Sequence, residues 1–371
     1  MPWLVDMVGF LAGSHVFLLA LTVGLAFLLS LYGVPIARQA AMKFGMVDAA
    51  DGRLKHQREP IPYLGGLAIY LAFLVSLGLT FEFRHDVLGM VLAGTLMLLL
   101  GLIDDFGVLS PATKLIGQLL AIFVLIKSGI RIQIMAVPDW LDVTLTVIWM
   151  LGITNAFNLL DIMDGLAAGV GVISATFLLG VAVLNGDTTI AFMLAALAGS
   201  LLGFLRYNFH PARIYMGDAG SLFLGLMLGA LAMTGSYTDR HPISLVSPLL
   251  ILGVPIFDTV FVMYIRFLRG LPIFLGSPDH MPLRLRHWGL TVPQVVCISY
   301  VASIVLGVVA LIVMTTSADV AMALIGAAML GCVILTFALK RVDVTRSELR
   351  PLQNTASKGA TDEQGQVRLW S

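Results

Sequence analysis

The sequence predicts an all-α protein that crosses a membrane many times. Of its 371 residues, 58% are hydrophobic and only 12% are charged, and the mean hydropathy is +0.95. A soluble domain carries about 25% charged residues. The hydrophobic residues also gather in long runs, separated by short segments that contain charge, proline or glycine. Side chains in such numbers cannot all be buried in a core and must face lipid, which excludes a water-soluble globule.

Eleven apolar runs are predicted to be transmembrane helices, with ten as the nearest alternative, because a span needs about 20 apolar residues. They form one integral membrane domain over residues 1–341, and the polar segment 342–371 is predicted to be a disordered cytoplasmic tail. The first run has no basic segment before it, which favours a retained helix over a cleaved signal peptide. The runs cover residues 9–34, 64–81, 87–103, 112–128, 143–160, 166–184, 188–205, 220–236, 243–264, 292–315 and 319–339.

The basic residues predict the orientation of these spans. Of the 22 lysines and arginines, seventeen fall on one set of alternate connections together with the tail. Only Arg84, Lys127, Arg131 and Arg240 fall on the other side, and Lys114 lies within the fourth run. Cytoplasmic loops carry the excess of positive charge. The N-terminus is therefore expected outside and the C-terminus in the cytoplasm, while the net charge of zero gives no reason to expect nucleic acid.

Acidic and amide side chains interrupt the apolar pattern at four places. Carboxylates near bilayer depth are costly and are usually functional. All four groups fall at the predicted cytoplasmic face, which indicates one shared site, whereas Asp258 within the ninth run is expected to pair inside the bundle. Asp218 alone could equally be a helix N-cap, and the basic loop could be an ordinary solvated segment. The groups are Asp104–Asp105, then Asn155, Asn158, Asp161 and Asp164, then Asp218, and finally Asp279, His280, Arg284, Arg286 and His287.

This composition favours phosphate chemistry. A few hard oxygen ligands beside Lys, Arg and His are typical of a divalent-metal site for a polyanionic substrate, and they suit Mg²⁺, with Mn²⁺ as the alternative, better than zinc. The sequence contains no Cys/His zinc spacing, GxxxxGK[ST] or GxSxG. Cys297 and Cys332 lie inside apolar runs and are interpreted as packing residues.

Four sequence motifs contain most of these polar groups: "DGRLKHQREPIPYLGG" (Asp51–Gly66), "GLIDDF" (Gly101–Phe106) followed by Lys114 and Gln118, "NAFNLLDIMDGLAAG" (Asn155–Gly169) and "YMGDAGSLFLG" (Tyr215–Gly225). Together they resemble the polyprenyl-phosphate N-acetylhexosamine-1-phosphate transferase family. They occur in the family's order and cover most of the chain. The family's loop after the ninth run usually carries a His-x-His-His sequence, but here "HMPLRLRHWG" (His280–Gly289) keeps only His280, so Arg284 and Arg286 could supply the missing cationic donors.

The resemblance implies a Mg²⁺-dependent enzyme of the bacterial inner membrane. It would move a sugar 1-phosphate from a UDP-N-acetylhexosamine to undecaprenyl phosphate and release UMP. The resemblance leaves open whether the enzyme forms a homodimer. It implies Asp104, Asp105 and Asp161 as catalytic residues and Asp218, Asp105 and Asp161 as metal ligands. The implied substrate-binding residues are Lys55, His56, Lys114, Asn155, Asn158, Asp164, Arg213, Tyr215, His280 and Arg284.

The sequence leaves open the sugar donor, the route of attack and a different class of protein. Eleven spans resemble the N-acetylglucosamine-1-phosphate branch, so UDP-GlcNAc is the expected donor, and the phospho-N-acetylmuramoyl-pentapeptide branch or another UDP-N-acetylhexosamine is the alternative. A lipid phosphate is already mostly deprotonated at pH 7, which favours direct attack over a route through an aspartyl-phosphate. An ion-coupled transporter is disfavoured. Transporter sites lie near the midplane of the membrane and often between repeats, whereas the acidic groups here fall at the predicted cytoplasmic face.

Overall fold

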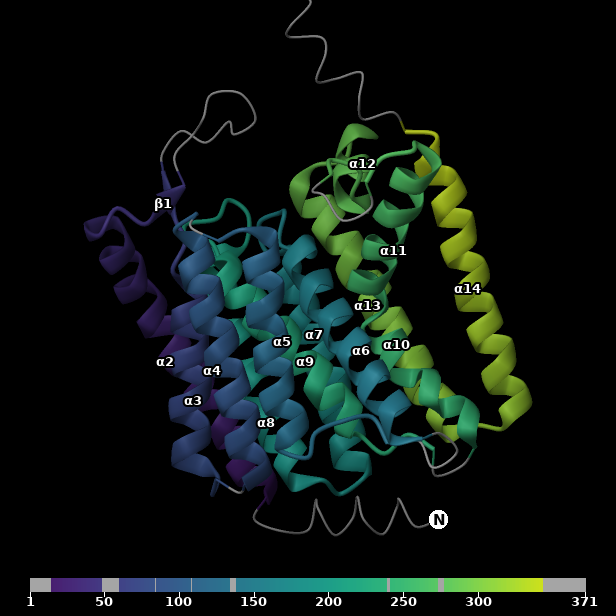
Figure 1. Ribbon diagram of the computed structural model, residues 1–371, viewed down its shortest axis with the longest axis horizontal. Helices are drawn as coiled ribbons and strands as arrows, with labels where there is room; N and C mark the ends of the chain where they lie inside the picture. Colours follow the sequence, from purple (N-terminus) through teal and green to yellow (C-terminus); the bar gives the residue numbers. More distant parts are fainter. Residues whose placement is uncertain are drawn as a thin grey trace, which may run out of the picture.

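Long apolar helices make up most of the structure, a computed structural model that describes residues 15–48, 60–83, 85–107, 109–133, 138–238, 241–272 and 277–342 (Figure 1). They run roughly along one direction, with β1 and α12 at the same end of the bundle. The helices are α2 (His15–Lys43), α3 (Gly65–Thr80), α4 (His85–Asp105), α5 (Pro111–Lys127), α6 (Asp139–Leu160), α7 (Leu166–Leu184), α8 (Thr188–Asn208), α9 (Gly217–Thr234), η1 (Pro242–Val246), α10 (Ser247–Ile251), α11 (Gly253–Leu268), α12 (Met281–His287), α13 (Val292–Thr315) and α14 (Ala318–Lys340).

The all-α, multi-pass membrane fold is confirmed. Within the described ranges, eight helices are long and apolar enough to cross a membrane, or nine if the bent pair Pro242–Ile251 and Gly253–Leu268 forms one span. Each of the eleven predicted runs coincides with a helix or with this pair. The number eleven itself stays a prediction, because α3 and α5 have only 16 and 17 residues, fewer than the ~20 that a span usually needs.

Three local features differ from the sequence prediction. The first helix is predicted to end near residue 34 but continues through Pro35 to Lys43. The ninth run is broken, with a bend of 79°; Pro255 clashes with a helical carbonyl four residues earlier, and α10 ends at that residue, Ile251. Finally, two strands that the sequence did not predict, β1 (Val47–Asp48) and β2 (Ile61–Pro62), pair antiparallel.

Helix α9 lies in the interior of the bundle and packs against α3, α4 and α6. Nearly all of its residues are buried, whereas α14 stands at the edge, where it packs mainly against α13 and buries few side chains. This arrangement places the N-terminus of α9 among the ends of neighbouring helices. The predicted tail lies almost entirely outside the described residues, as do residues 1–14.

Candidate active site

The ends of four helices bring the predicted acidic groups together. Helix α4 ends at Asp105, α6 ends just before Asp161, α9 begins at Gly217, and α5 begins at Pro111, three residues before Lys114. Because α9 begins where α4 and α6 end, residues far apart in the sequence become neighbours. Three of the four groups that the sequence placed in one site therefore meet, and the group around His280 lies elsewhere.

Lys114 links two of these acids. Its Nζ lies 2.7 Å from Asp104 Oδ2 and 2.7 Å from Asp218 Oδ2, and it also donates a hydrogen bond to Asn158 Oδ1 at 3.3 Å. The Nδ2 of Asn158 donates to the other oxygen of Asp218 at 2.7 Å. A lysine and an amide thus fix both carboxylate oxygens of Asp218, and they offset part of the negative charge in the cluster.

The adjacent aspartates Asp104 and Asp105 have different environments. Asp105 accepts hydrogen bonds from the backbone N–H groups of Asp218 (2.7 Å) and Ala219 (3.2 Å). A carboxylate at a helix C-terminus opposes the helix dipole, whereas one at a helix N-terminus is favoured. Asp105 therefore caps α9 from the end of α4. Gly217 has a φ of +73°, and a Cβ there would lie 2.7 Å from Asp105 Oδ2, so this contact requires glycine.

Glycine contacts between backbones bring the capping groups into position. A Cβ on Gly101 of α4 would overlap the backbone of Ala219, and one on Gly66 of α3 would overlap the backbone of Gly220. The absence of a side chain at these positions lets α3 and α4 approach the first turn of α9. The glycines within the sequence motifs therefore have a packing role that supports the acidic cluster.

We expect Gly101→Ala to destabilise the protein by about 1–3 kcal/mol, the usual effect of overpacking, and to lower activity by separating Asp105 from α9. Thermal unfolding and activity of the purified variant would measure both effects. Gly152→Ala in α6 is the matched control, because a Cβ at Gly152 would meet no described atom of another element within 4 Å. Equal effects of the two substitutions would contradict the packing role of Gly101.

Asp105, Asp161, Asp164 and Asp218 open onto one cavity of about 520 Å³, and Asp104 is not among its lining residues. Among the described residues, the carboxylate of Asp161 has no hydrogen-bond donor and no ion pair. Burial, together with the negative charges of Asp218, Asp105 and Asp164, raises the pKa of Asp161 to about 7. The cavity therefore holds more negative charge than its own residues neutralise. It is lined by Tyr63, Asp105, Asn158, Asp161, Ile162, Met163, Asp164, Asn208, Tyr215, Gly217 and Asp218.

The donor set of this cavity fits Mg²⁺ in its chemistry. Asp161 and Asp218 supply hard carboxylate oxygens, and Asp161 lacks a cationic partner among the described residues. No three acidic, histidine or cysteine side chains of the described ranges form a ready-made metal site. Both oxygens of Asp105 contact α9. The two oxygens of Asp218 contact Lys114 and Asn158, so a metal ion at Asp218 would share an oxygen with one of these groups. This agrees with the usual coordination of Mg²⁺ in proteins, in which one or two carboxylates are combined with waters and substrate phosphates.

A second set of contacts joins two segments at the cavity wall. Asp164 Oδ2 lies 2.8 Å from His210 Nδ1 and accepts a hydrogen bond from Ala212 N at 3.0 Å. Asn208 Oδ1 accepts from Gly165 N at 3.0 Å, and its Nδ2 donates to the backbone O of Ile214 at 3.0 Å. Asp164 and Asn208 therefore line the cavity and also hold the segment after α8 against the loop after α6.

Sequence reasoning missed Tyr63 and Asn208 as cavity residues. Tyr63 lies two residues before Gly65, inside the first of the four sequence motifs. Asn208 is a buried amide at the end of an apolar helix, a signal of the same kind as Asn155 and Asn158. A polar residue at a span end was therefore the available clue in both cases.

Four predicted substrate-binding residues lie away from the cavity lining or outside the described structure. Asn155 exchanges two hydrogen bonds with Gln118, at 2.9 and 3.1 Å, and so joins α6 to α5. Arg213 is exposed, and its carbonyl accepts a hydrogen bond from Arg38 Nε at 3.1 Å. Lys55 and His56 lie outside the described residues. Of the remaining predicted contacts, Asn158, Asp164 and Tyr215 line the cavity, and Lys114 contacts its acids.

The group around His280 forms a separate buried cluster. His280 Nδ1 lies 2.7 Å from Asp258 Oδ2, which confirms that Asp258 pairs inside the bundle. Arg284 is fully buried and donates to Asp279 Oδ1 (2.6 Å) and to the carbonyls of Leu339 (2.9 Å) and Val342 (2.6 Å). Its donors are thus used within the protein. In this structure His280 and Arg284 anchor α12, and Arg284 also holds the end of α14. Their role as substrate contacts stays a prediction.

The fold and the site define a multi-pass membrane enzyme whose helix ends carry clustered carboxylates, as expected for a phosphate-bearing substrate. A family model described as glycosyl transferase family 4 matches residues 87–236, the segment that contains Asp104, Asp161 and Asp218. This chain belongs to that family and is a phosphotransferase, as the motifs predicted.

Three relatives support the assignment. A probable undecaprenyl-phosphate N-acetylglucosaminyl 1-phosphate transferase of Bacillus subtilis is 36% identical over 77% of this chain and 84% of its own length. A decaprenyl-phosphate N-acetylglucosaminephosphotransferase of Mycolicibacterium smegmatis is 34% identical over 67% and 70%. A phospho-N-acetylmuramoyl-pentapeptide-transferase of Halalkalibacterium halodurans is 35% identical over 69% and 84%.

Proposed function

We propose that the protein transfers N-acetylglucosamine 1-phosphate from UDP-GlcNAc to undecaprenyl phosphate and releases UMP. The observation that carries this proposal is the convergence of Asp104, Asp105, Asp161 and Asp218 from three helices, with Lys114 bridging two of them. The names of two of the relatives support N-acetylglucosamine as the sugar and a polyprenyl phosphate as the acceptor. The reaction would begin the assembly of a cell-envelope polysaccharide.

The residues of the site would act mainly by position and charge. A phosphate monoester has its second pKa near 6, so the attacking lipid phosphate needs no obligatory general base at pH 7. Lys114 holds Asp104 and Asp218 in place, and Asn158 fixes the second oxygen of Asp218. Tyr215 and Asp164 lie on the cavity wall, and they would contact the nucleotide. Direct attack on the sugar-bearing phosphorus is the simpler route for this arrangement.

We further propose that Asp161 and Asp218 hold Mg²⁺, or Mn²⁺ in its place, with phosphate oxygens and waters as the other ligands. The bound ion would neutralise charge on the diphosphate during transfer. We expect removal of the ion with EDTA to abolish turnover and added Mg²⁺ to restore it. We also expect Asp161→Asn to raise the Mg²⁺ concentration needed for half-maximal activity, while Asp139→Asn, an exposed acid, leaves it unchanged. Full activity in EDTA would contradict this proposal.

The decisive experiment is an assay of UMP release by purified protein with undecaprenyl phosphate and a panel of UDP-sugars. UDP-GlcNAc should be the best donor. One relative is a phospho-N-acetylmuramoyl-pentapeptide-transferase, so UDP-N-acetylmuramoyl-pentapeptide belongs in the panel as the second candidate, with other UDP-N-acetylhexosamines beside it. Preference for the pentapeptide would assign the second function, and no release from any donor would refute both.

The orientation is also proposed from charge. The site end of the bundle lies toward the cytoplasm if the seventeen basic residues mark that side, and this places the donor cavity where nucleotide sugars are made. The N-terminus would then lie outside the bacterial inner membrane. A C-terminal reporter that is accessible to an impermeant label in intact cells would overturn both the orientation and the location of the site.

A further inference from the structure

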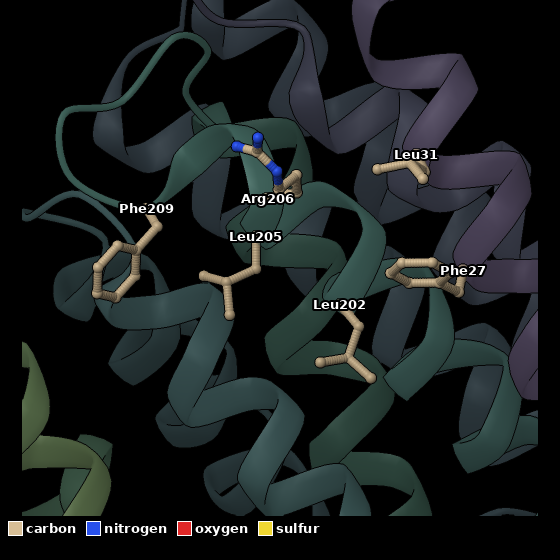
Figure 2. Close-up of a pocket in the computed structure, with 6 residues that line it drawn as sticks. All are labelled: Phe27, Leu31, Leu202, Leu205, Arg206 and Phe209. Carbon is tan, nitrogen blue, oxygen red and sulfur yellow. The ribbon is translucent and has the colours of Figure 1, made fainter.

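An apolar groove of about 460 Å³ lies between α2 and α8, outside the acidic cavity (Figure 2). Phe27 and Leu31 form the α2 side, and Leu202 and Leu205 form the α8 side. Both helices are long and apolar enough to cross a membrane. They come together closely because Gly203 has no side chain: a Cβ at this position would overlap the carbonyl of Phe27. The groove is therefore a depression in a surface that faces the bilayer.

One end of the groove carries positive charge. Arg206 lines it from the last turn of α8 and is exposed. No ion pair of Arg206 occurs among the described residues. Arg38 and Arg213 lie together near the same ends of α2 and α8, since Arg38 Nε donates to the Arg213 carbonyl at 3.1 Å. The groove thus combines apolar walls with a cationic end, the pattern of a site for an amphipathic anion.

The groove is separate from the catalytic carboxylates, although both use the end of α8. Asn208 lines the acidic cavity, whereas Arg206 and Phe209 line the groove. Arg206 is not among the residues of the acidic cavity. Residues two apart in an α-helix point about 200° apart, so Arg206 and Asn208 face different sides of α8. A lipid phosphate held by Arg206 would then lie on another side of α8 than the carboxylate cluster. This argues against the polyprenyl acceptor as the occupant of the groove.

We propose that this groove binds an anionic phospholipid, with an acyl chain between α2 and α8 and the phosphate at Arg206. Apolar side chains that face lipid accept an acyl chain readily, and a cationic residue near the membrane surface attracts anionic headgroups. A guanidinium also forms charge-assisted hydrogen bonds to phosphate oxygens. This inference rests on the groove alone and does not depend on the proposed transferase reaction.

The test is lipid titration of the full-length protein in detergent, with retained lipid counted by native mass spectrometry. Phosphatidylglycerol is the probe, and phosphatidylcholine with the same chains, undecaprenyl phosphate and inorganic phosphate are the comparison ligands. We expect phosphatidylglycerol to bind more tightly than phosphatidylcholine and inorganic phosphate. Undecaprenyl phosphate, the proposed acceptor, should bind in a way that Arg206→Gln does not change. Arg206→Gln should weaken the binding of phosphatidylglycerol by about tenfold or more, as expected for loss of a hydrogen bond to a charged group.

Two further variants make the result specific. Leu202→Trp should fill the apolar part of the groove and weaken phosphatidylglycerol binding without unfolding the protein, because Leu202 is 39% exposed. Arg286→Gln removes an exposed arginine of α12 and should leave binding unchanged. The proposal is overturned if Arg206→Gln has no effect or if Arg286→Gln has an equal one. It is also overturned if Arg206→Gln weakens the binding of undecaprenyl phosphate as much as that of phosphatidylglycerol, if inorganic phosphate binds as tightly as phosphatidylglycerol, or if Leu202→Trp changes only the oligomeric state.

Discussion

Asp218→Asn is expected to lower turnover about a hundredfold or more, because it removes a carboxylate that the site positions for charge neutralisation during phosphate transfer. Lys114 and Asn158 each contact one oxygen of Asp218 at 2.7 Å. The substitution keeps the shape of the side chain but replaces a charged oxygen with an amide. Lys114 would still pair with Asp104, so we expect the protein to remain folded.

Steady-state UMP release at several Mg²⁺ concentrations would measure this effect, and thermal unfolding would verify the fold. Asp139→Asn is a suitable control, because Asp139 is an exposed acid whose contact with Arg131 spans 3.6 Å. Near-normal turnover of Asp218→Asn at low Mg²⁺ would show that this carboxylate is not a metal ligand. Equal losses in both variants would point instead to a general effect of lost negative charge.

The second large effect is expected for stability rather than for chemistry. Arg284→Ala should lower the free energy of unfolding by about 3 kcal/mol or more, as expected when one partner of a buried ion pair is removed. Arg284 is fully buried, lies 2.6 Å from Asp279 Oδ1, and binds two carbonyls at the end of α14. Its loss would leave Asp279 with Arg269 as its remaining arginine partner in the described structure.

Thermal and denaturant unfolding of the purified variant would test this expectation, with Arg286→Ala as the matched control. Arg286 is exposed and contacts only the Leu290 carbonyl at 3.4 Å among the described residues, so its removal should change stability by no more than about 0.5 kcal/mol. A normal stability of Arg284→Ala, combined with a tenfold or greater loss of activity per folded molecule, would support the role of Arg284 as a substrate contact.

The sequence was informative wherever local composition decides the outcome. Apolar runs interrupted by charge predicted a helix at eleven places, because hydropathy decides which segments enter lipid. The structure has a helix at ten of them and a bent pair at the ninth run. The cost of placing carboxylates near lipid indicated Asp104, Asp105, Asp161 and Asp218 as one group. The same reasoning correctly predicted that Asp258 pairs inside the bundle. Sequence motifs then identified the family.

Only the tertiary structure decided what each polar side chain contacts. Asp104 and Asp105 are neighbours in the sequence, yet one pairs with Lys114 and the other caps α9. The physical reason is that helix crossing, fixed by glycine contacts such as Gly101 on Ala219, determines which side chains meet, and no local pattern encodes it. The same limit applies to Arg284. The sequence predicted that its guanidinium donates hydrogen bonds to a substrate phosphate, and only the structure shows that it also donates to carbonyls at the end of α14.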